Sequence, residues 1–315
     1  MLQNMNTSDN NNTSVCANCG KEGDDVNNTC NKCKMVKYCN AACKKKHRHK
    51  HKKECEEHVR LAAEHAAKLN DEKLFKQPPP LHEDCPICFL RLPYLVSGRR
   101  YQSCCGKVIC TGCCFAPIYD DQGNVIVEKT CAFCRVPMPE TDEESIERDK
   151  KRMEANDAIA IHNAGLDYMN GTNVYQQDYK KALELFHRAK DLGCTEAYCS
   201  ISLAYLHGRG AEVDKKKAVH YCELAAMGGD VTARYNLGIK EAKAGNVDRA
   251  ARHFIIAVRG GYAKSLERIK QLYSNGHATK EDYMKALQSF QTYLGEIKSE
   301  QRDKAAQSDD RFRYY

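Results

Sequence analysis

The 315-residue chain contains no tryptophan, only eight prolines and no long apolar run. No stretch approaches the roughly 20 apolar residues that a membrane-spanning helix needs. The first 14 residues (MLQNMNTSDNNNTS) lack the apolar core of a secretory signal peptide. The sequence also lacks a phosphate-binding glycine loop and a serine or cysteine nucleophile paired with a base. These absences predict a soluble protein of the cytoplasm or nucleus, without a membrane partner and without a conventional enzyme fold.

Cysteine, by contrast, is abundant and unevenly distributed. Of 19 cysteines, 16 lie between residues 16 and 134. In a reducing compartment such closely spaced pairs indicate metal sites rather than a disulfide framework. The other three, Cys194, Cys199 and Cys222, have the spacing of ordinary buried thiols.

The first cluster contains eight candidate metal ligands in four pairs. They are Cys16-x2-Cys19, Cys30-x2-Cys33, Cys39-x3-Cys43 and His51-x3-Cys55. Zinc in closed structural sites takes four cysteine or histidine ligands, so eight ligands predict two tetrahedral sites. Spacing alone does not say which pairs share a metal.

This cluster closely resembles the MYND finger in the order of its pairs, in Tyr38 before Cys39 and in the final His-x3-Cys. That family is cross-braced. The resemblance therefore implies one zinc on Cys16, Cys19, Cys39 and Cys43, and another on Cys30, Cys33, His51 and Cys55. His47, one helical turn before His51, is a rival ligand that the family spacing disfavours.

A second cysteine cluster follows and resembles a RING finger. The segments that carry the resemblance are Cys85-Pro-Ile-Cys88, Cys104-Cys105-Gly-Lys-Val-Ile-Cys110-x2-Cys113-Cys114 and Cys131-x2-Cys134-Arg135. The resemblance implies one zinc on Cys85, Cys88, Cys110 and Cys113, and a second on Cys104, Cys105, Cys131 and Cys134. Lys107 stands where many RING fingers have a ligand histidine, and adjacent cysteines reach one metal only by splaying. Four zinc ions are expected, and the site with Cys104 and Cys105 is the one that departs from the family pattern. Cys114 is an alternative ligand for that site.

A RING finger recruits a ubiquitin-conjugating enzyme and positions its thioester-linked ubiquitin. By resemblance, Ile87 would form the apolar contact and Arg135 would bridge enzyme and ubiquitin. The missing tryptophan, the C-A-F-C ending and a hairpin-like segment with a Gly123-Asn124 turn depart from the family. Two interpretations therefore stay open: an active ligase finger, and a zinc-stabilised fold used only for protein contact.

Residues 44–53 (KKKHRHKHKK) contain seven of the chain's basic residues and no acid, within a formal net charge of +7. One interpretation is a nucleic-acid patch or import signal. The other is charge compensation, since a zinc held by four thiolates is formally −2. No aromatic residues for base stacking are interleaved, which favours compensation and makes a nucleic-acid partner a weak alternative.

The C-terminal half is repetitive, with Lys-Ala or Arg-Ala pairs at Ala182, Ala218, Ala250 and Ala286, separated by 36, 32 and 36 residues. Such periods predict a solenoid of helix pairs. The segment AYLHGRGAEVDKKKAV resembles Sel1-like repeats, relatives of the tetratricopeptide repeat, and the third copy lacks its inter-helix G-x-G. The resemblance implies a groove for a protein or peptide. The scattered histidines are expected to be surface or packing residues, not catalytic ones; they are His162, His187, His220 and His253.

The expected fold is multidomain, with two small cross-braced zinc fingers (MYND and RING-like α+β) and an all-α helical-repeat solenoid. The segments are a disordered N-terminus (1–14), the MYND-type finger (15–55), a helix and proline linker (56–83), the RING-like finger (84–138), a charged helical linker (139–157), the repeats (158–297) and a polar tail (298–315) that frays unless Tyr314 and Tyr315 dock. The predicted function is a RING-type ubiquitin ligase or a ligase-associated substrate adaptor. The alternative is a non-catalytic scaffold.

Overall fold

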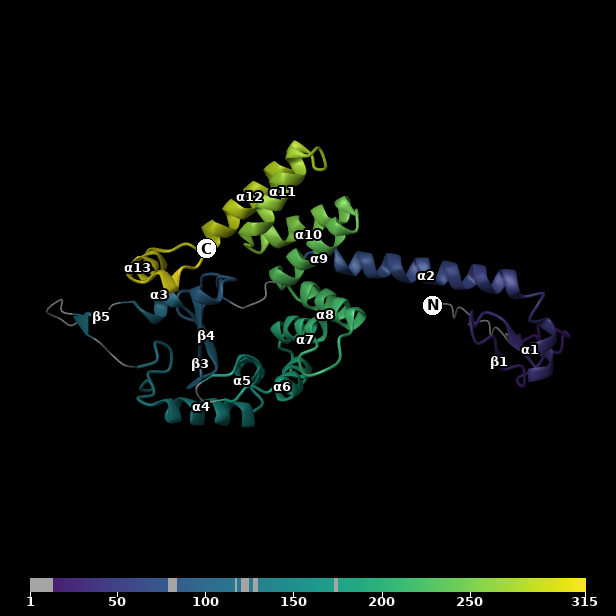
Figure 1. The fold of residues 1–315 in the computed structure, drawn as a ribbon, viewed down its shortest axis with the longest axis horizontal. Coiled ribbons are helices and arrows are strands. Elements are labelled where there is room, and N and C mark those ends of the chain that lie inside the picture. The colour runs from purple at the N-terminus through teal and green to yellow at the C-terminus, as the bar shows by residue number, and fades with distance from the viewer. Residues whose placement is uncertain (1–13, 79–83, 117, 120–124, 127–129, 173–174) are drawn as a thin grey trace, which may run out of the picture. The chain divides into compact units, whose positions relative to one another are not determined.

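A computed structural model describes residues 14–78, 84–116, 118–119, 125–126, 130–172 and 175–315. The chain divides into two units, residues 1–73 and 74–315, and each is described by itself (Figure 1). None of the helices in the described ranges is both long and apolar enough to cross a membrane.

The first unit contains a small finger and a long helix. Its elements are β1 (Asn28–Thr29), β2 (Lys37–Tyr38), α1 (Ala41–His47) and α2, which spans Lys52–Leu74. β1 and β2 are antiparallel, and Val26 and Tyr38 are buried beside Cys16. The side chain of Asn40 caps α1 by accepting from the backbone N–H of Cys43 at 2.9 Å, which satisfies one free donor of the first turn.

Helix α2 confirms the helix predicted within the linker 56–83, although its apolar side chains stay in solvent. Val59 is 42% exposed and Leu69 is 43% exposed. Arg60 instead pairs with Glu57 and Glu64 along the surface. Ion pairs three and four residues apart support a helix along its own surface without tertiary packing. Two of the linker prolines, Pro79 and Pro80, lie outside the described residues.

The second unit begins with the RING-like cysteine cluster. Its elements are η1 (Val96–Gly98), β3 (Arg99–Gln102), β4 (Lys107–Cys110), α3 (Thr111–Cys114), β5 (Ile118–Tyr119) and β6 (Val125–Ile126). β3 and β4 form an antiparallel hairpin in which Arg99 faces Cys110. β5 also pairs with β6 in antiparallel fashion, as the predicted hairpin requires. The predicted turn residues Gly123 and Asn124 lie outside the described residues.

Helix α4 (Asp142–Glu154) lies within the charged helical linker predicted over residues 139–157. The Thr141 hydroxyl accepts from the N–H of Glu144 at 3.2 Å, although the Glu144 carboxylate accepts from Glu140 instead of closing a capping box. The ion pairs Glu144–Arg148 and Glu147–Lys151 support the helix along its surface.

The repeats form four successive helix pairs. They are α5 (Ala158–Asn170) with α6 (Tyr179–Asp191), α7 (Glu196–His207) with α8 (Lys215–Met227), α9 (Val231–Lys243) with α10 (Val247–Arg259), and α11 (Ala263–Ser274) with α12 (Lys280–Ile297). The four alanines that set the predicted period are at most 3% exposed. The third pair is joined by the short segment 244–246, whereas the second needs 208–214, as its missing G-x-G predicts.

Glycine lets the paired helices approach each other closely. A Cβ at Gly165 would lie 2.6 Å from the ring of Phe186, and one at Gly238 would lie 2.5 Å from the ring of Phe254. Real Cβ atoms do not come that close, so the aromatic ring of the second helix occupies space that glycine leaves in the first. This explains why small residues recur at fixed positions of the repeat.

The C-terminal segment is folded, so of the two outcomes expected for it, fraying or docking, the structure shows docking. Helix α13 (Glu300–Ser308) and η2 (Asp310–Phe312) follow the last repeat. Tyr314 is 1% exposed, as its predicted docking requires, while Tyr315 remains 59% exposed. The Tyr314 hydroxyl donates to Asp303 at 2.5 Å. Although the segment is polar in composition, its few aromatic residues carry the packing.

Candidate metal centres and their surroundings

Within the described residues, four groups of cysteine and histidine have ligand atoms that all lie within 4.8 Å of one another. They contain the sixteen predicted ligands in the predicted sets. The groups are Cys16, Cys19, Cys39 and Cys43; Cys30, Cys33, His51 and Cys55; Cys85, Cys88, Cys110 and Cys113; and Cys104, Cys105, Cys131 and Cys134. Zinc–sulfur bonds of about 2.3 Å are normal for such donor sets.

The separations between sulfur atoms fit tetrahedral metal sites. The Sγ atoms of Cys30 and Cys55 lie 3.7 Å apart, those of Cys88 and Cys110 lie 3.8 Å apart, and those of Cys105 and Cys131 lie 4.0 Å apart. Four sulfurs bonded tetrahedrally to one zinc at about 2.3 Å lie about 3.8 Å from one another. A disulfide would require about 2.05 Å, so these thiols are free and arranged around a common centre.

One backbone turn recurs at four of the five C-x2-C pairs, all but Cys110-x2-Cys113. The residue after the second cysteine has a left-handed conformation at Gly20, Lys34, Phe89 and Arg135, with φ between 57° and 74°. Its N–H donates to the carbonyl of the first cysteine at 2.8 to 3.0 Å in every case. A left-handed conformation is costly for residues with a Cβ, so its repetition in both fingers indicates a shared requirement to aim two sulfurs at one point.

The same turn prepares a thiolate. Burial alone would raise the pKa of Cys16 and Cys30, but backbone N–H groups of the turns lower both to about 6. Turn N–H groups likewise bring the pKa of Cys131 to about 7 against burial. The pKa of Cys85 is lowered by hydrogen bonds from Cys110 and Cys113. Because the thiolate is the form that binds metal, these four cysteines are prepared for coordination.

The structure distinguishes His51 from its rival. His51 is 3% exposed, and its Nε2 lies 3.2 Å from Cys33 Sγ within the second group. His47 lies outside every group, and its Nδ1 is 3.3 Å from the Tyr38 hydroxyl. The role of His47 is therefore to stack on His51, with ring centroids 5.9 Å apart.

Cys104 and Cys105 occupy the turn between β3 and β4, where Gly106 adopts φ 71°. The sharp turn allows the two adjacent sulfurs to face one candidate metal centre. The Sγ atom of Cys104 lies 3.4 Å from that of Cys134. Lys107 is exposed at the start of β4. Cys114 stays outside the group; burial raises its thiol pKa to about 12, and Gln102 donates to its sulfur.

The basic run 44–53 serves the first finger in part. Lys44 donates to the carbonyl of Thr29 at 2.6 Å and to the side chains of Asn28 and Asn31. This lysine thus closes the loop that carries Cys30, which is a structural role within the finger. Most other side chains of the run are exposed.

The two residues predicted to contact a conjugating enzyme differ in exposure. Ile87 is half-buried against the core of its own finger, whereas Arg135 is exposed. Phe89, which was not predicted as a functional residue, is 78% exposed in a left-handed conformation. Its position one residue after a C-x2-C pair is the signal that could have singled it out.

The RING-like finger packs along the row of turns between repeats. The Tyr101 hydroxyl donates to Asp157, the N-cap of α5, at 2.8 Å. The centroid of the Tyr94 ring lies 5.4 Å from that of Tyr262, the residue before α11. The backbone N–H of Tyr94 donates to the hydroxyl of Tyr293 in α12. The finger therefore contacts the first and last helix pairs, a placement that spacing could not predict.

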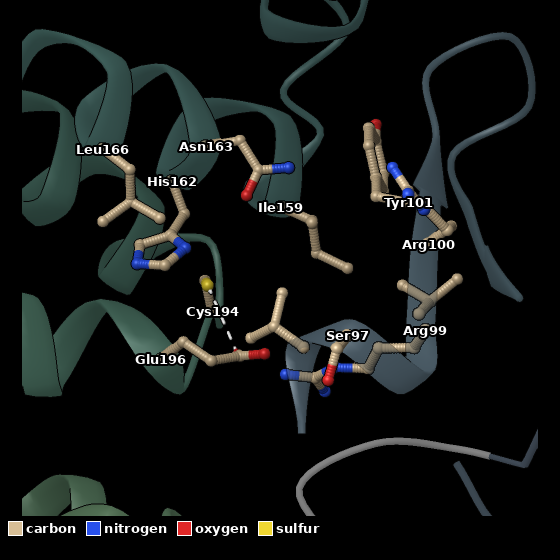
Figure 2. Close-up of a pocket in the computed structure, with 12 residues that line it drawn as sticks. Ser97, Arg99, Arg100, Tyr101, Ile159, His162, Asn163, Leu166, Cys194 and Glu196 are labelled. Carbon is tan, nitrogen blue, oxygen red and sulfur yellow. Dashed lines mark hydrogen bonds between the residues drawn. The ribbon is translucent and has the colours of Figure 1, made fainter. Parts of the chain in front are cut away.

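A cavity of about 520 Å³ lies between the finger and the first two helix pairs. Figure 2 shows Arg99 and Tyr101 from β3 opposite His162 from α5 and Glu196 from α7. Burial lowers the pKa of Arg99, and the charge of Glu196 opposes that effect. His162 packs on Phe186 and lies 3.0 Å from Ser200 Oγ, which agrees with its predicted packing role.

Comparisons with known families identify two of the three modules. Residues 16–55 match the family model of the MYND finger, and residues 158–194 and 195–230 match the Sel1 repeat. The chain therefore contains a zinc-binding MYND finger and Sel1 repeats, two kinds of module that bind proteins. The RING-like cluster is indicated by the structure alone.

A segment of 103 residues is 35% identical to the ERAD-associated E3 ubiquitin-protein ligase component HRD3B of Arabidopsis thaliana. It covers 32% of this chain and only 16% of that relative. Among solved structures, a Sel1 repeat protein from Oxalobacter formigenes is 25% identical, with a TM-score of 0.43 over 55% of this chain and 67% of the other. The protective antigen c5321 of uropathogenic Escherichia coli, with an SLR fold, is 21% identical, with a TM-score of 0.41 over 55% and 43%.

Proposed function

We propose that this protein is a zinc-dependent interaction adaptor that works beside a ubiquitin ligase. In this proposal the MYND finger and the repeats bind partner proteins, and the RING-like finger has a structural role. The main support is the attachment of that finger to its own chain. Carbonyls of Leu90 and Arg91, in the loop that carries Ile87, accept from buried Arg302 of α13. A loop that is hydrogen-bonded to the C-terminal helix of its own chain is suited to a structural role.

The similarity to HRD3B supports the association with a ligase. That relative is a component of a ligase by its name, and it shares 35% identity over the matched segment. Because the match covers a small part of the relative, the association is a proposal for this chain. We also propose the cytoplasm or nucleus as its location, because free zinc-binding thiols persist where thiols stay reduced.

An intrinsic RING-type ligase is the second candidate. It is favoured by exposed Arg135 directly after the last ligand and by the four-sulfur groups of the finger. A guanidinium at this position has the planar set of donors needed to bridge two proteins. Here the finger would orient a conjugating enzyme and would itself do no covalent chemistry.

Self-ubiquitination of the zinc-loaded full chain with a panel of conjugating enzymes separates the two candidates. The adaptor predicts no ubiquitin chains from a folded protein that holds four zinc ions. Chains that disappear in both Ile87→Ala and Arg135→Ala would establish the ligase instead. Arg311→Ala, an exposed arginine far from the loop in sequence, serves as the matched control for loss of charge.

A second assay tests the adaptor directly. The full chain and a Cys30→Ser variant, which lacks one MYND ligand, would be used to purify bound proteins from cells. The adaptor predicts that a ubiquitin ligase copurifies with the full chain and that a subset of other partners is lost with Cys30→Ser. Recovery of no ligase component in either sample would refute the proposed association.

A further inference from the structure

Arg302 is a fully buried arginine at the edge of a candidate metal centre. It lies on α13 and is 0% exposed. Its Nη1 donates to the carbonyls of Arg91 at 2.8 Å and Ile297 at 2.6 Å. Its Nη2 lies 3.7 Å from Cys88 Sγ, a predicted zinc ligand 214 positions earlier in the chain.

The charge of this arginine calls for a negative partner. Burying a guanidinium is costly unless it is paired and hydrogen-bonded. Cys88 belongs to the group with Cys85, Cys110 and Cys113, and four thiolates around one zinc carry a formal charge of −2. The Arg302 guanidinium therefore has the sign and the position to offset that charge.

The backbone of α13 also touches the ligand-bearing helix α3. Gly112 lies between Cys110 and Cys113, and a Cβ there would be 2.7 Å from the N atom of Arg302. The side chain of Gln301 reaches Cys113, with Oε1 3.8 Å from Sγ. Only a residue without a side chain permits this contact between the metal-binding helix and the C-terminal helix.

The remainder of the C-terminal segment fastens α13 in place. The Phe312 ring stacks on Phe115 with centroids 4.2 Å apart. The Ser97 hydroxyl donates to the carbonyl of Arg313, and Tyr314 packs against Gly98. These contacts, which follow α13 in the sequence, hold Arg302 beside the candidate metal centre.

We propose that the C-terminal segment 299–315 forms the outer wall of the metal site of Cys85, Cys88, Cys110 and Cys113, with Arg302 as its positioning residue. Arg302 fixes the Cys88 loop through the carbonyls of Leu90 and Arg91. It also donates toward the Cys88 sulfur and offsets the charge of the thiolates. Zinc retention at one finger then depends on the last residues of the chain. Partners of this outer kind commonly change metal affinity by about 10 to 100-fold.

The test compares zinc release from the full-length wild type, Arg302→Met and Arg311→Met in the presence of a chromogenic chelator. Methionine retains an unbranched side chain but removes the charge and the donors. Arg302→Met is expected to release one of four zinc ions at least about 10-fold faster. Arg311 is 82% exposed at its side chain and belongs to the same segment, so Arg311→Met should behave as wild type.

Cadmium-113 NMR of the substituted proteins identifies the site. We expect Arg302→Met to shift one signal of a four-sulfur site and to leave the other three in place. Unchanged release and an unchanged spectrum would overturn the proposal. An equal change in all four signals would overturn it too, because it would mean general loosening of the protein.

Arg302→Lys covers the case in which Arg302→Met does not fold, as judged by circular dichroism. Lysine keeps the charge but cannot reach the carbonyls and the sulfur together. We expect faster release from the same single site. A folded Arg302→Lys variant with wild-type release and spectrum would then refute the role of the guanidinium.

Discussion

His253 is a buried histidine with no hydrogen-bond partner on either ring nitrogen among the described residues. Its ring packs on Phe75 with centroids 4.6 Å apart. Burial, aided by the nearby charge of Arg234, lowers its pKa from 6.5 to about 4. The residue therefore stays neutral in the folded protein at neutral pH and serves packing rather than proton transfer.

This pKa shift predicts a pH dependence of stability. Between pH 6.5 and about 4 the unfolded chain binds a proton at His253 that the folded chain does not. The free energy of unfolding should therefore fall with acidification by up to about 1.4 kcal/mol per pH unit in that window. Urea unfolding of wild type and His253→Phe across the window should show a shallower slope for the variant. Exposed His220→Phe is the control, and an identical slope for wild type and His253→Phe would contradict the prediction.

Gly238 tests the close approach of paired helices. Gly238→Ala would place a Cβ 2.5 Å from the Phe254 ring, and overpacking of this kind costs about 1 to 3 kcal/mol. Gly295 lies within helix α12, and a Cβ added there would meet no other atom within 4 Å. Gly295→Ala should therefore be neutral or stabilising by up to about 1 kcal/mol. Thermal unfolding of the two variants measures the difference; equal midpoints would argue against the steric role of Gly238.

At the scale of elements, the end of helix α2 is anchored while its middle is not. Leu74 is 1% exposed, and its carbonyl accepts from Arg234 of α9. The guanidinium carbons of Arg252 and Arg249 lie 3.7 and 5.1 Å from the centre of the Phe75 ring. Cations at such distances from an aromatic face are attracted to it, so Phe75 fixes the segment to the repeats.

Phe75→Ala should release this anchor. We expect backbone amides of residues 74–77 to exchange hydrogen at least about tenfold faster, which corresponds to about 1.4 kcal/mol. Hydrogen exchange read by mass spectrometry is the measurement. Leu69→Ala removes an exposed side chain from the same helix and should leave the exchange unchanged. Equal exchange in all three proteins would show that Phe75 does not hold the segment.

At the scale of the whole molecule, metal-dependent and metal-independent folding coexist. The buried clusters of the repeats around Phe186 and Phe254 contain no predicted zinc ligand. The finger cores, in contrast, consist largely of the ligands themselves, with few other apolar residues such as Ile109 and Leu92. Small modules of this kind depend on metal for most of their stability.

Removal of zinc should therefore separate the two kinds of module. After exhaustive chelation we expect the four zinc ions to leave, the fingers to lose their protection from proteolysis, and the far-ultraviolet helical signal to persist for the most part. Native mass spectrometry counts the metal, and circular dichroism follows the helices. Readdition of zinc is the control for reversibility. Collapse of the whole helical signal on chelation would mean that the repeats cannot fold without the fingers.

The sequence by itself determined the ligand pairs and the repeat register, because both are encoded locally, whereas the grouping of the pairs was implied only by family resemblance. A C-x2-C pair forms its turn from adjacent residues, and buried Ala182 and Ala218 mark helix contacts at a fixed period. The MYND finger and the Sel1 repeats were predicted from such patterns and are confirmed. The roles of Ile87 and Arg135 remain predictions.

Only the tertiary structure decided where the C-terminal segment lies and what the RING-like finger packs against. The contact of Arg302 with Cys88 joins residues 214 apart, and no local pattern records such a pair. Its energy comes from burying one charge against a group of thiolates that the fold assembles elsewhere. Polar composition left fraying or docking of the tail open, whereas three-dimensional packing made it part of the finger.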